Sequence, residues 1–397
     1  MDPLILTGTL VIDGTGADPA RGRAVVVEDG RIAAVVDEAR LPRGRRIDLA
    51  GAALLPGLIN CHVHLCLGAE PDPLMVLRGE SAAATTIKAV VRARQTVEAG
   101  VTTVRDLGGR EYCELALRRA IHDGLVPGPR ILAAGRPVCM TGGHGHWLGR
   151  EADGVDDVRR AVREQLKAGA DVIKIIATGG VLTPGVEPGS PQLTLDEMRA
   201  AVEEARKAGR RTAAHAQGAT GIADAVAAGI TSIEHGIYLT DEVVARMRRD
   251  GTFLVPTLNA PAAITAGGLA AGIPDFVVRK SDSVIDAHVK SFQAALAAGV
   301  PIAAGSDAGT PLNLHGSLLP ELELMVEHGM APLEAIRAAT AVAADLLGLG
   351  DSIGRIAPGY VADLVAVAGN PAERIQALAD VNTVLVGGRV MAGLDRT

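Results

Sequence analysis

From Leu54 to about Leu347 the sequence alternates short β-rich runs with longer alanine-rich helical stretches. The eight runs are Leu54–His64, Thr102–Asp106, Arg130–Gly135, Val172–Ala177, Thr212–His215, Ser232–His235, Phe253–Thr257 and Ile302–Ser306. Strands that alternate with helices form right-handed βαβ units and a parallel sheet, and eight such units close naturally into a (β/α)8 barrel. The alternation therefore predicts an α/β fold with a (β/α)8 TIM-like barrel, and an open doubly wound sheet is the alternative.

The helical stretches between these runs carry a recurring stop signal. Several end in the dipeptide Ala-Gly, at Ala99-Gly100, Ala168-Gly169, Ala208-Gly209, Ala228-Gly229 and Ala298-Gly299. Helices commonly stop at a glycine in the left-handed conformation. We therefore expect these glycines to end helices and to lead into the next strand.

The two ends of the chain do not share this pattern. The first fifty residues read as short strands with turns, including an Asp29-Gly30 hairpin turn. After residue 350 the strand pattern returns, at Ala362–Ala368 and Val381–Val386. We expect residues 1–56 and 351–397 to form the two parts of one small β-sandwich domain, with a barrel of residues 57–350 inserted between them.

Composition excludes several classes of protein. The formal net charge of -7 argues against a nucleic-acid surface, which needs clustered Lys and Arg. Four cysteines in 397 residues are too few for a disulfide framework, which favours a reducing compartment. The start of the chain lacks the pattern of a signal peptide, and no apolar run reaches membrane-spanning length. We expect a cytoplasmic protein that binds neither nucleic acid nor membrane.

Lys174 stands in the apolar run Asp171-Val-Ile-Lys-Ile-Ile-Ala177. Lysines are almost never fully buried without a partner, and a lysine in a low dielectric tends to lose its proton. A neutral amine is a nucleophile that can capture carbon dioxide and become a carbamate, an anionic oxygen donor able to bridge two cations. The alternative is a lysine whose stem lies in the core while its ammonium group reaches the end of the strand.

Other metal-binding side chains fall at the ends of the predicted strands, where barrel enzymes build their active sites. They are His62 and His64 on the first strand, His215 on the fifth, His235 on the sixth and Asp307 after the eighth. Alternate residues of a strand point to the same side, so both histidines of the first strand can face one cation. Imidazole and carboxylate donors suit zinc and similar ions.

This pattern predicts a two-metal site. His62, His64 and Asp307 would hold one divalent ion, His215 and His235 the other, and carboxylated Lys174 would bridge the two together with a hydroxide. Such a hydroxide is a strong nucleophile near neutral pH, because the cations lower its pKa while they polarise the substrate carbonyl. Asp307 would take the hydroxide proton and pass it to the leaving amine.

The chain resembles the amidohydrolase superfamily of metal-dependent hydrolases over nearly its whole length. The resemblance rests on Lys174, His215 and His235 together with three motifs: Pro56-Gly-Leu-Ile-Asn-Cys-His-Val-His64, Gly305-Ser-Asp307 and Gly354-Arg-Ile-Ala-Pro-Gly-Tyr-Val-Ala-Asp-Leu364. It implies a barrel joined to a β-sandwich, and two zinc ions bridged by carboxylated Lys174.

Two further stretches are similar to the branch of prolidases (Xaa-Pro dipeptidases) and zinc carboxypeptidase-like enzymes. They are Met140-Thr-Gly-Gly-His144 and Glu234-His-Gly-Ile-Tyr238. The resemblance implies that His144 contacts the scissile carbonyl oxygen and that Tyr238 contacts the free α-carboxylate of the substrate. His146 is an alternative to His144.

The remaining histidines receive structural roles. We assign His315 to ordering of a loop near the site, and we expect His122, His288 and His328, in helical stretches, on the surface. The tract Thr178–Gly185 contains glycines but lacks the Gly-Lys-Ser/Thr ending of a phosphate-binding loop, so we assign it to the pocket wall or a lid.

The first functional hypothesis is a binuclear zinc hydrolase that cleaves dipeptides, Xaa-Pro or similar, or N-acyl amino acids. On the same site the alternative substrate is a cyclic amide, a lactone or a xenobiotic amide such as a mycotoxin. A mononuclear deaminase is disfavoured because Ala-Gln-Gly follows His215 where such enzymes usually carry a glutamate. A catalytically silent scaffold is disfavoured by the complete ligand set. The branch also implies a homo-oligomer.

Overall fold

The computed structural model describes residues 2–393, which form a mixed α/β structure. Two parallel sheets occupy its centre, one in the order β6-β7-β8 and the other in the order β10-β9-β11-β12-β13-β14. Their strands are β6 (Leu58–Val63), β7 (Val101–Asp106), β8 (Arg130–Ala133), β9 (Val138–Cys139), β10 (Arg150–Glu151), β11 (Val172–Ile176), β12 (Arg211–Ala216), β13 (Ser232–His235) and β14 (Phe253–Val255).

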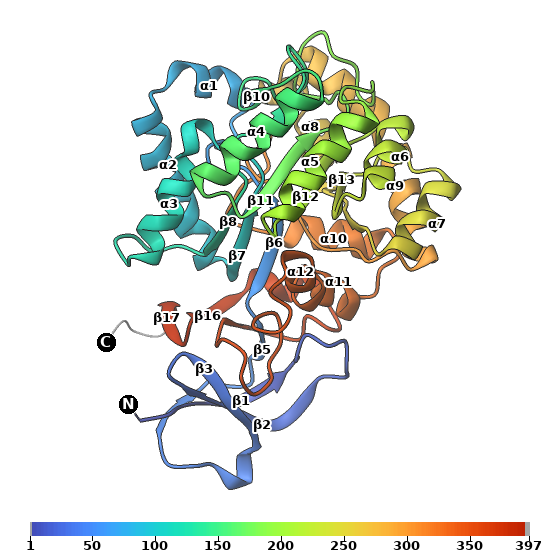
Figure 1. Ribbon diagram of the computed structural model, residues 1–397. Coiled ribbons are helices and arrows are strands. Elements are labelled where there is room, and N and C mark those ends of the chain that lie inside the picture. Colours follow the sequence, from blue (N-terminus) through green and yellow to red (C-terminus); the bar gives the residue numbers. More distant parts are fainter. Residues whose placement is uncertain (1, 394–397) are drawn as a thin grey trace.

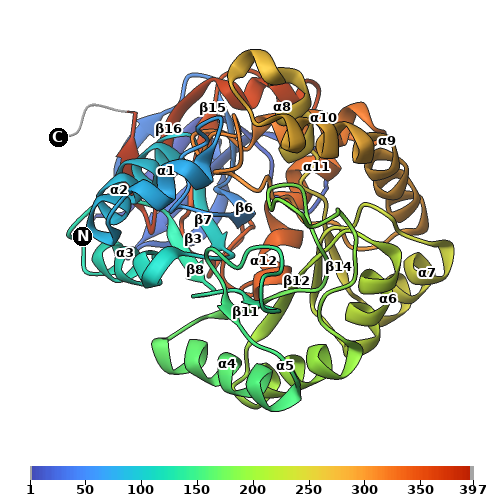
Figure 2. The same cartoon turned by 90° about the horizontal axis from the view of Figure 1, so that it is seen from above.

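Helices surround these parallel strands (Figure 2). They are α1 (Pro73–Gly79), α2 (Ala82–Glu98), α3 (Cys113–His122), α4 (Val155–Ala168), α5 (Leu195–Lys207), α6 (Ala219–Ala228), α7 (Asp241–Asp250), α8 (Asn259–Gly267), α9 (Asp275–Ala298), α10 (Leu319–Glu327), α11 (Pro332–Ala338) and α12 (Ala341–Leu347). Short 3-10 turns lie at Glu38–Arg40, Arg110–Tyr112, Leu269–Ala271 and Ile375–Ala379. The glycines predicted to stop helices all have positive φ, as Gly169 and Gly299 illustrate with φ of 99° and 72°. No helix within residues 2–393 has the length and apolarity needed to cross a bilayer.

The predicted eighth strand, Ile302–Ser306, is not assigned as a strand. It makes an isolated parallel bridge to β14 at Ile302. Beyond that its backbone partners change from residue to residue: Ala304 N donates to Ala338 O at 2.9 Å, and Ser306 N donates to the Asn60 side chain at 3.1 Å. A regular ladder cannot form where a helix carbonyl and a side-chain amide replace strand partners.

The same segment nevertheless connects the two parallel sheets. Cys61 N in β6 donates to Ala304 O at 2.9 Å, and Ala303 N donates to Leu254 O of β14 at 3.0 Å. On the other side, Asp171 N at the start of β11 donates to Ala133 O of β8 at 2.8 Å. The carboxyl ends of the parallel strands are thereby held near one another, and the closed eight-stranded ring stays a prediction.

The two ends of the chain share one eight-stranded mixed sheet below the parallel strands (Figure 1). Its strands are β1 (Leu4–Val11), β2 (Ala20–Glu28), β3 (Arg31–Asp37), β4 (Arg45–Asp48), β5 (Ala53–Pro56), β15 (Leu364–Val367), β16 (Val381–Val386) and β17 (Arg389–Ala392). Antiparallel pairing of β15 with β5 joins the C-terminal part to the N-terminal part. The strands belong to a single hydrogen-bonded sheet, so a two-layered sandwich and its domain limits stay predictions; the end of the last predicted segment, residues 394–397, lies outside the described residues.

Glu114, in the first turn of α3, is an acidic residue with no exposed surface. Its Oε1 atom has no hydrogen-bond partner among the described residues, and its Oε2 atom is 3.8 Å from the Cys113 thiol. Burial, assisted by the nearby Asp106 carboxylate, raises the pKa of Glu114 to about 8. The folded chain therefore holds a proton that the unfolded chain would release.

We predict a pH-dependent stability difference between the wild type and Glu114→Gln. Above pH 4.5, the ordinary pKa of the side chain, unfolding releases the Glu114 proton, so rising pH favours the unfolded state up to about pH 8. In Glu114→Gln the side chain has no such proton to release, so this loss of stability with rising pH is absent. Urea unfolding at several pH values should show the wild type losing up to about 1.4 kcal/mol per pH unit relative to the variant within that window. A constant difference would contradict the prediction.

Candidate functional site

All six predicted metal ligands line one cavity. They are His62, His64, Lys174, His215, His235 and Asp307. The cavity lies at the carboxyl ends of the parallel strands, where side chains from β6, β11, β12 and β13 meet. The structure therefore brings together residues that are up to 245 positions apart in the sequence (Asp307 minus His62).

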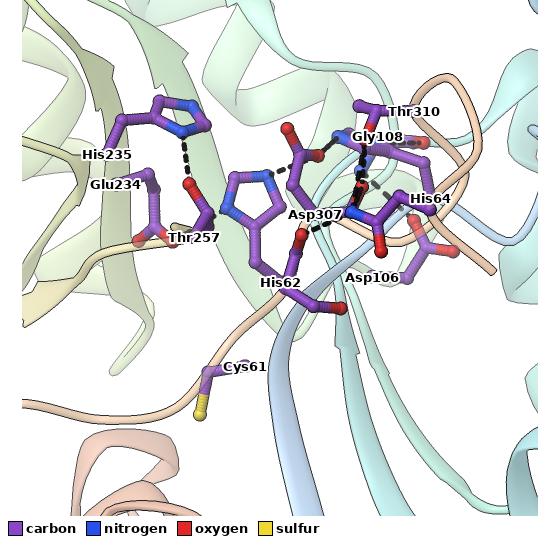
Figure 3. Close-up of polar contacts among 12 residues, drawn as sticks. Cys61, His62, His64, Asp106, Gly108, Glu234, His235, Thr257, Asp307 and Thr310 are labelled. Carbon is purple, nitrogen blue, oxygen red and sulfur yellow. Dashed lines mark hydrogen bonds and ion pairs between the residues drawn. The ribbon is translucent and has the colours of Figure 1, made fainter. Parts of the chain in front are cut away.

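His62 and His64 both face the carboxylate of Asp307 (Figure 3). The Nε2 atoms of the two rings lie 3.3 and 3.4 Å from Asp307 Oδ1. The opposite ring nitrogens are occupied, because Nδ1 of His62 is 2.9 Å from Glu234 Oε2 and Nδ1 of His64 is 2.9 Å from Gly108 O. The acceptors at Nδ1 place the ring protons there and leave both Nε2 lone pairs facing Asp307.

These contacts are ion pairs only if the imidazoles are charged, and burial argues that they are not. It lowers the pKa of His62 well below its ordinary value and lowers that of His64 as well. Asp307 Oδ1 is buried and has no hydrogen-bond donor among the described residues, and burial raises the pKa of this carboxyl to about 7. Three acceptor atoms thus converge with no donor between them, an arrangement that a divalent cation satisfies.

His215 and His235 form the second half of the site, with ring centroids 4.6 Å apart. Nδ1 of His235 is 2.7 Å from Thr257 Oγ1, which leaves Nε2 free. Nε2 of His215 is 3.2 Å from Gly179 O, which leaves Nδ1 free. Burial lowers the pKa of both rings well below its ordinary value, so each offers a neutral nitrogen donor.

Lys174 has 3% of its surface exposed, and its Nζ atom has no hydrogen-bond partner among the described residues. Burial lowers the pKa of its ammonium group to about 8, although the negative charges of Glu234 and Asp307 oppose the shift. A buried amine without a partner is costly in either protonation state. The donor set therefore fits metal ions, and Lys174 is the position at which an added anionic group would complete it.

Three residues at the same strand ends have a strained backbone. His235, Thr257 and Asp307 have positive φ values of 71°, 54° and 59°. A left-handed conformation costs on the order of 1–3 kcal/mol for a residue other than glycine. Side chains hold the strained carbonyls: the Asn313 amide donates to Asp307 O at 3.0 Å, and His288 Nε2 donates to His235 O at 3.0 Å.

The expectation that His288 lies on the surface is wrong. His288 is buried on α9, where Val277, Ser281, Val284 and His288 recur at helical spacing on the inward face, and it also contacts Pro256 O at 2.7 Å. A histidine in a 24-residue helix gives no sign in the sequence of which face is covered. His122 is exposed and His328 is partly exposed, while His315 is buried with Nε2 2.8 Å from Leu67 O, which fits a loop-ordering role.

A buried ion pair that the sequence analysis missed lies beneath His62. Glu234 accepts hydrogen bonds from Arg105 Nη2 at 2.8 Å and from Ser232 Oγ at 2.5 Å, besides facing His62. Arg105 Nε also donates to Cys61 O at 2.6 Å. Arg105 lies in the run Val101-Thr-Thr-Val-Arg-Asp106 and Glu234 in the run Ser232-Ile-Glu-His235, so neither has the uninterrupted apolar surroundings of Lys174. The sequence signal was a charged residue inside a predicted strand, which is weaker than the signal at Lys174.

The two residues predicted to contact substrate lie in different surroundings. His144 lines the cavity, and its ring centroid is 4.3 Å from that of His215. The alternative, His146, does not line the cavity, and its Nδ1 contacts Gly143 O at 2.9 Å. Tyr238 is 38% exposed and lies outside the cavity lining, on the segment that follows β13.

The tract Thr178–Gly185 was assigned to the pocket wall or a lid. Two of its residues, Val181 and Leu182, form part of the cavity wall.

Comparison with known proteins gives a consistent result. A model of the Amidohydrolase family matches residues 53–391. The ochratoxinase of Aspergillus niger is 35% identical over 98% of this chain and 86% of its own length. Its crystal structure matches with a TM-score of 0.86 at 32% identity, covering 99% of this chain and 96% of that chain.

Peptidases are also among the similar solved structures. A Xaa-Pro dipeptidase with methionine bound in its active site matches with a TM-score of 0.91 at 34% identity, covering 98% of this chain and 99% of that one. A putative prolidase from Bifidobacterium longum matches with a TM-score of 0.87 at 32% identity, covering 98% of this chain and 94% of that one.

We predict that Arg105→Met destabilises the fold strongly, because it leaves the buried Glu234 carboxylate without its cation. Removing one partner of a buried pair typically lowers the free energy of unfolding by about 3–5 kcal/mol. The double variant Arg105→Met/Glu234→Gln should recover part of this loss in urea unfolding. Arg119→Met, which removes an exposed pair with Asp123, should change stability little. A double variant no more stable than Arg105→Met would contradict the prediction.

Proposed function

This chain belongs to the amidohydrolase family and is a hydrolase that acts on amide bonds; from this premise we propose that it is a binuclear zinc enzyme cleaving dipeptides, Xaa-Pro or similar, or N-acyl amino acids. The observation that carries the proposal is the set of buried atoms that lack hydrogen-bond partners within residues 2–393. Asp307 Oδ1 faces two neutral imidazoles without a donor, and Lys174 Nζ faces the same cavity without an acceptor.

The donor set divides between two ions. His62, His64 and Asp307 would hold one, His215 and His235 the other, and a carbamate on Lys174 would bridge them. When bound, two such cations would lower the pKa of a water molecule and polarise the amide carbonyl. Imidazole and carboxylate donors favour zinc.

The chain's own residues would supply proton transfer and substrate orientation. Asp307 would accept the proton that the attacking water loses and deliver it to the nitrogen of the leaving amine. His144, neutral because burial lowers its pKa to about 3, would donate a hydrogen bond to the carbonyl oxygen. Tyr238 would contact the free carboxylate at the outer end of the substrate.

A second candidate substrate is a xenobiotic amide such as a mycotoxin. The relative of 35% identity is named for a toxin substrate, and the walls of the cavity suit an apolar acyl group. Beyond the ligands, the described lining is mostly apolar, with Leu67, Leu107, Ile176, Ile237, Ile264 and Val284 among its members. Such a wall favours large apolar groups over charged ones.

The proposal also includes the finer features of the fold. The backbone bonds that flank Ile302–Ser306 support closure into a (β/α)8 barrel, and the sheet shared by residues 4–56 and 364–392 supports one terminal β-domain. The cytoplasmic location and the homo-oligomer stay predictions.

The function is tested by screening a panel of Xaa-Xaa dipeptides, N-acyl amino acids and aromatic xenobiotic amides with the zinc-loaded enzyme. We expect release of a free amino acid from at least one class, measured by mass spectrometry, with about two zinc ions per chain by elemental analysis. A chelator should abolish turnover, and Asp307→Asn should lower kcat about 100-fold or more. Inactivity across the panel at full metal loading would refute the proposal.

Lys174→Met provides the control for the bridging role. This variant keeps a buried apolar stem but cannot form a carbamate, so its metal content should fall below two ions per chain. Carbon-13 NMR of the wild type equilibrated with labelled bicarbonate should show a carbamate signal that the variant lacks. Full metal content in Lys174→Met would exclude the bridge.

Tyr238→Phe tests recognition of the substrate carboxylate. If the hydroxyl contacts that group, KM should rise about tenfold for substrates with a free carboxylate and change little for their amidated counterparts. Steady-state kinetics on matched pairs of substrates measures both values. Equal effects on the two kinds of substrate would remove the role given to Tyr238.

A further inference from the structure

The segment between β11 and α5, residues 177–194 and here called the β11 loop, folds back over the cavity as a compact hairpin. Gly179 N donates to Ser190 O at 2.8 Å, and Gln192 N donates to Ala177 O at 2.9 Å. From this base the loop reaches His144, whose backbone N–H donates to Gln192 Oε1 at 3.0 Å. The β11 loop thus binds His144, which belongs to the segment after β9.

Thr183, within this loop, makes the contact that determines the state of His144. Its Oγ1 atom lies 2.9 Å from Nδ1 of His144 and 3.5 Å from the backbone nitrogen of Gly145. The side chain is 2% exposed. Gly145 N can only donate, so among the described residues the acceptor available to the Thr183 hydroxyl proton is His144 Nδ1.

Only one tautomer of His144 satisfies all of these groups. If Nδ1 carried the ring proton, the Thr183 hydroxyl would accept twice, and its own proton would be buried without an acceptor, at a cost of about 1–3 kcal/mol. If Nδ1 is bare, Gly145 N–H donates to the hydroxyl and the hydroxyl donates to Nδ1. The ring proton then lies on Nε2.

We propose that Thr183 is a positioning residue for the hydrolytic reaction, which fixes the proton of His144 on Nε2 so that this atom can donate to the carbonyl oxygen of the substrate. The inference rests on the proposed function, because it gives a cause for the donor role of His144. Without the hydroxyl, the neutral ring would divide between two tautomers, and one of them offers the substrate a lone pair instead of a proton.

Contacts around Thr183 restrict its position. Lys280 on α9 donates to Thr183 O at 2.9 Å and also to Val186 O, so one ammonium group ties the loop to a long helix. Gly180 leaves the space that the histidine ring occupies, since a Cβ atom there would lie 2.6 Å from both Cε1 and Nε2 of His144. The β11 loop therefore meets the ring at Nδ1 through Thr183 and near Cε1 and Nε2 through Gly180.

The same loop acts on His215 in the complementary way. Gly179 O accepts from Nε2 of His215 at 3.2 Å, which places that ring's proton against the loop and leaves the Nδ1 lone pair for a cation. For His144 the loop offers a donor, and for His215 it offers an acceptor. The β11 loop thus leaves His144 with a proton on Nε2 that it can donate, and leaves His215 with a lone pair on Nδ1.

The test combines NMR with kinetics on the zinc-loaded enzyme labelled with 15N-histidine. Protonated and bare ring nitrogens resonate far apart, and a His144→Asn spectrum identifies the signals of His144. The wild type and Thr183→Ser should show a proton on Nε2 and a bare Nδ1, whereas Thr183→Val should show averaging between the tautomers. We expect kcat to fall about tenfold in Thr183→Val, with KM little changed, and to recover in Thr183→Ser.

Lys280→Met supplies a second variant that leaves the hydroxyl intact. Loss of its two hydrogen bonds should shift the His144 signals in the same direction as Thr183→Val, and Lys280→Arg should restore them. An Nδ1 proton in the wild type, or an unchanged spectrum in Thr183→Val, would overturn the role given to Thr183. Wild-type kcat in His144→Asn would instead overturn the role of His144 in the proposed function, so the two failures are distinguishable.

Discussion

The buried carboxylate of Asp307, facing two neutral imidazoles, is the contact on which the rest of the site depends. In a low dielectric an unpaired carboxylate and two lone pairs at 3.3 and 3.4 Å cannot coexist without a proton or a cation between them. Burial keeps the rings neutral, and their neighbours orient them: Glu234 accepts a hydrogen bond from His62 Nδ1, and Gly108 O accepts one from His64 Nδ1. The resulting shortage of positive charge is what makes the cavity a candidate metal site.

The shortage of positive charge does not extend to Glu234, because a buried ion pair with Arg105 neutralises that carboxylate. Arg105 neutralises Glu234, and Glu234 in turn fixes His62, so a buried ion pair supports the first ligand without entering the cavity. Carboxylate partners of this kind orient ligating histidines and raise their affinity for metal. Strain at His235 and Asp307 is tolerated because side chains from α9 and the loop before α10 hold the strained carbonyls.

Much of this arrangement could be predicted from the sequence, because parallel strands bring their carboxyl ends together. The six residues proposed as ligands were selected in this way, and they do line one cavity. Lys174 stood out as a charge in an apolar run. Arg105 and Glu234 stand in strands that also carry other polar residues, and their pairing joins β7 to β13, which no local pattern reveals. His288 was misplaced because only tertiary packing decides which face of α9 is covered. The irregular segment at Ile302–Ser306 depends on partners from Asn60 and Ala338, which lie 246 and 34 positions from the residues that they contact.

The sequence gives even less information on which ring nitrogens of His144 and His215 carry protons. The β11 loop determines these positions and also contributes to the cavity wall. Val181 and Leu182 of this loop form part of the apolar wall that a substrate meets, while Thr183 and Gly179 fix the protons of His144 and His215. A change of the loop that admits a larger acyl group would therefore also disturb the hydrogen bonds that prepare both histidines. Lys280 ties the loop backbone at Thr183 to α9, and Val181 packs in one buried cluster with Val277 of the same helix, so the apolar wall and the two hydrogen-bonding residues share their support. Under the proposed function, substrate range and the placement of these protons would therefore change together.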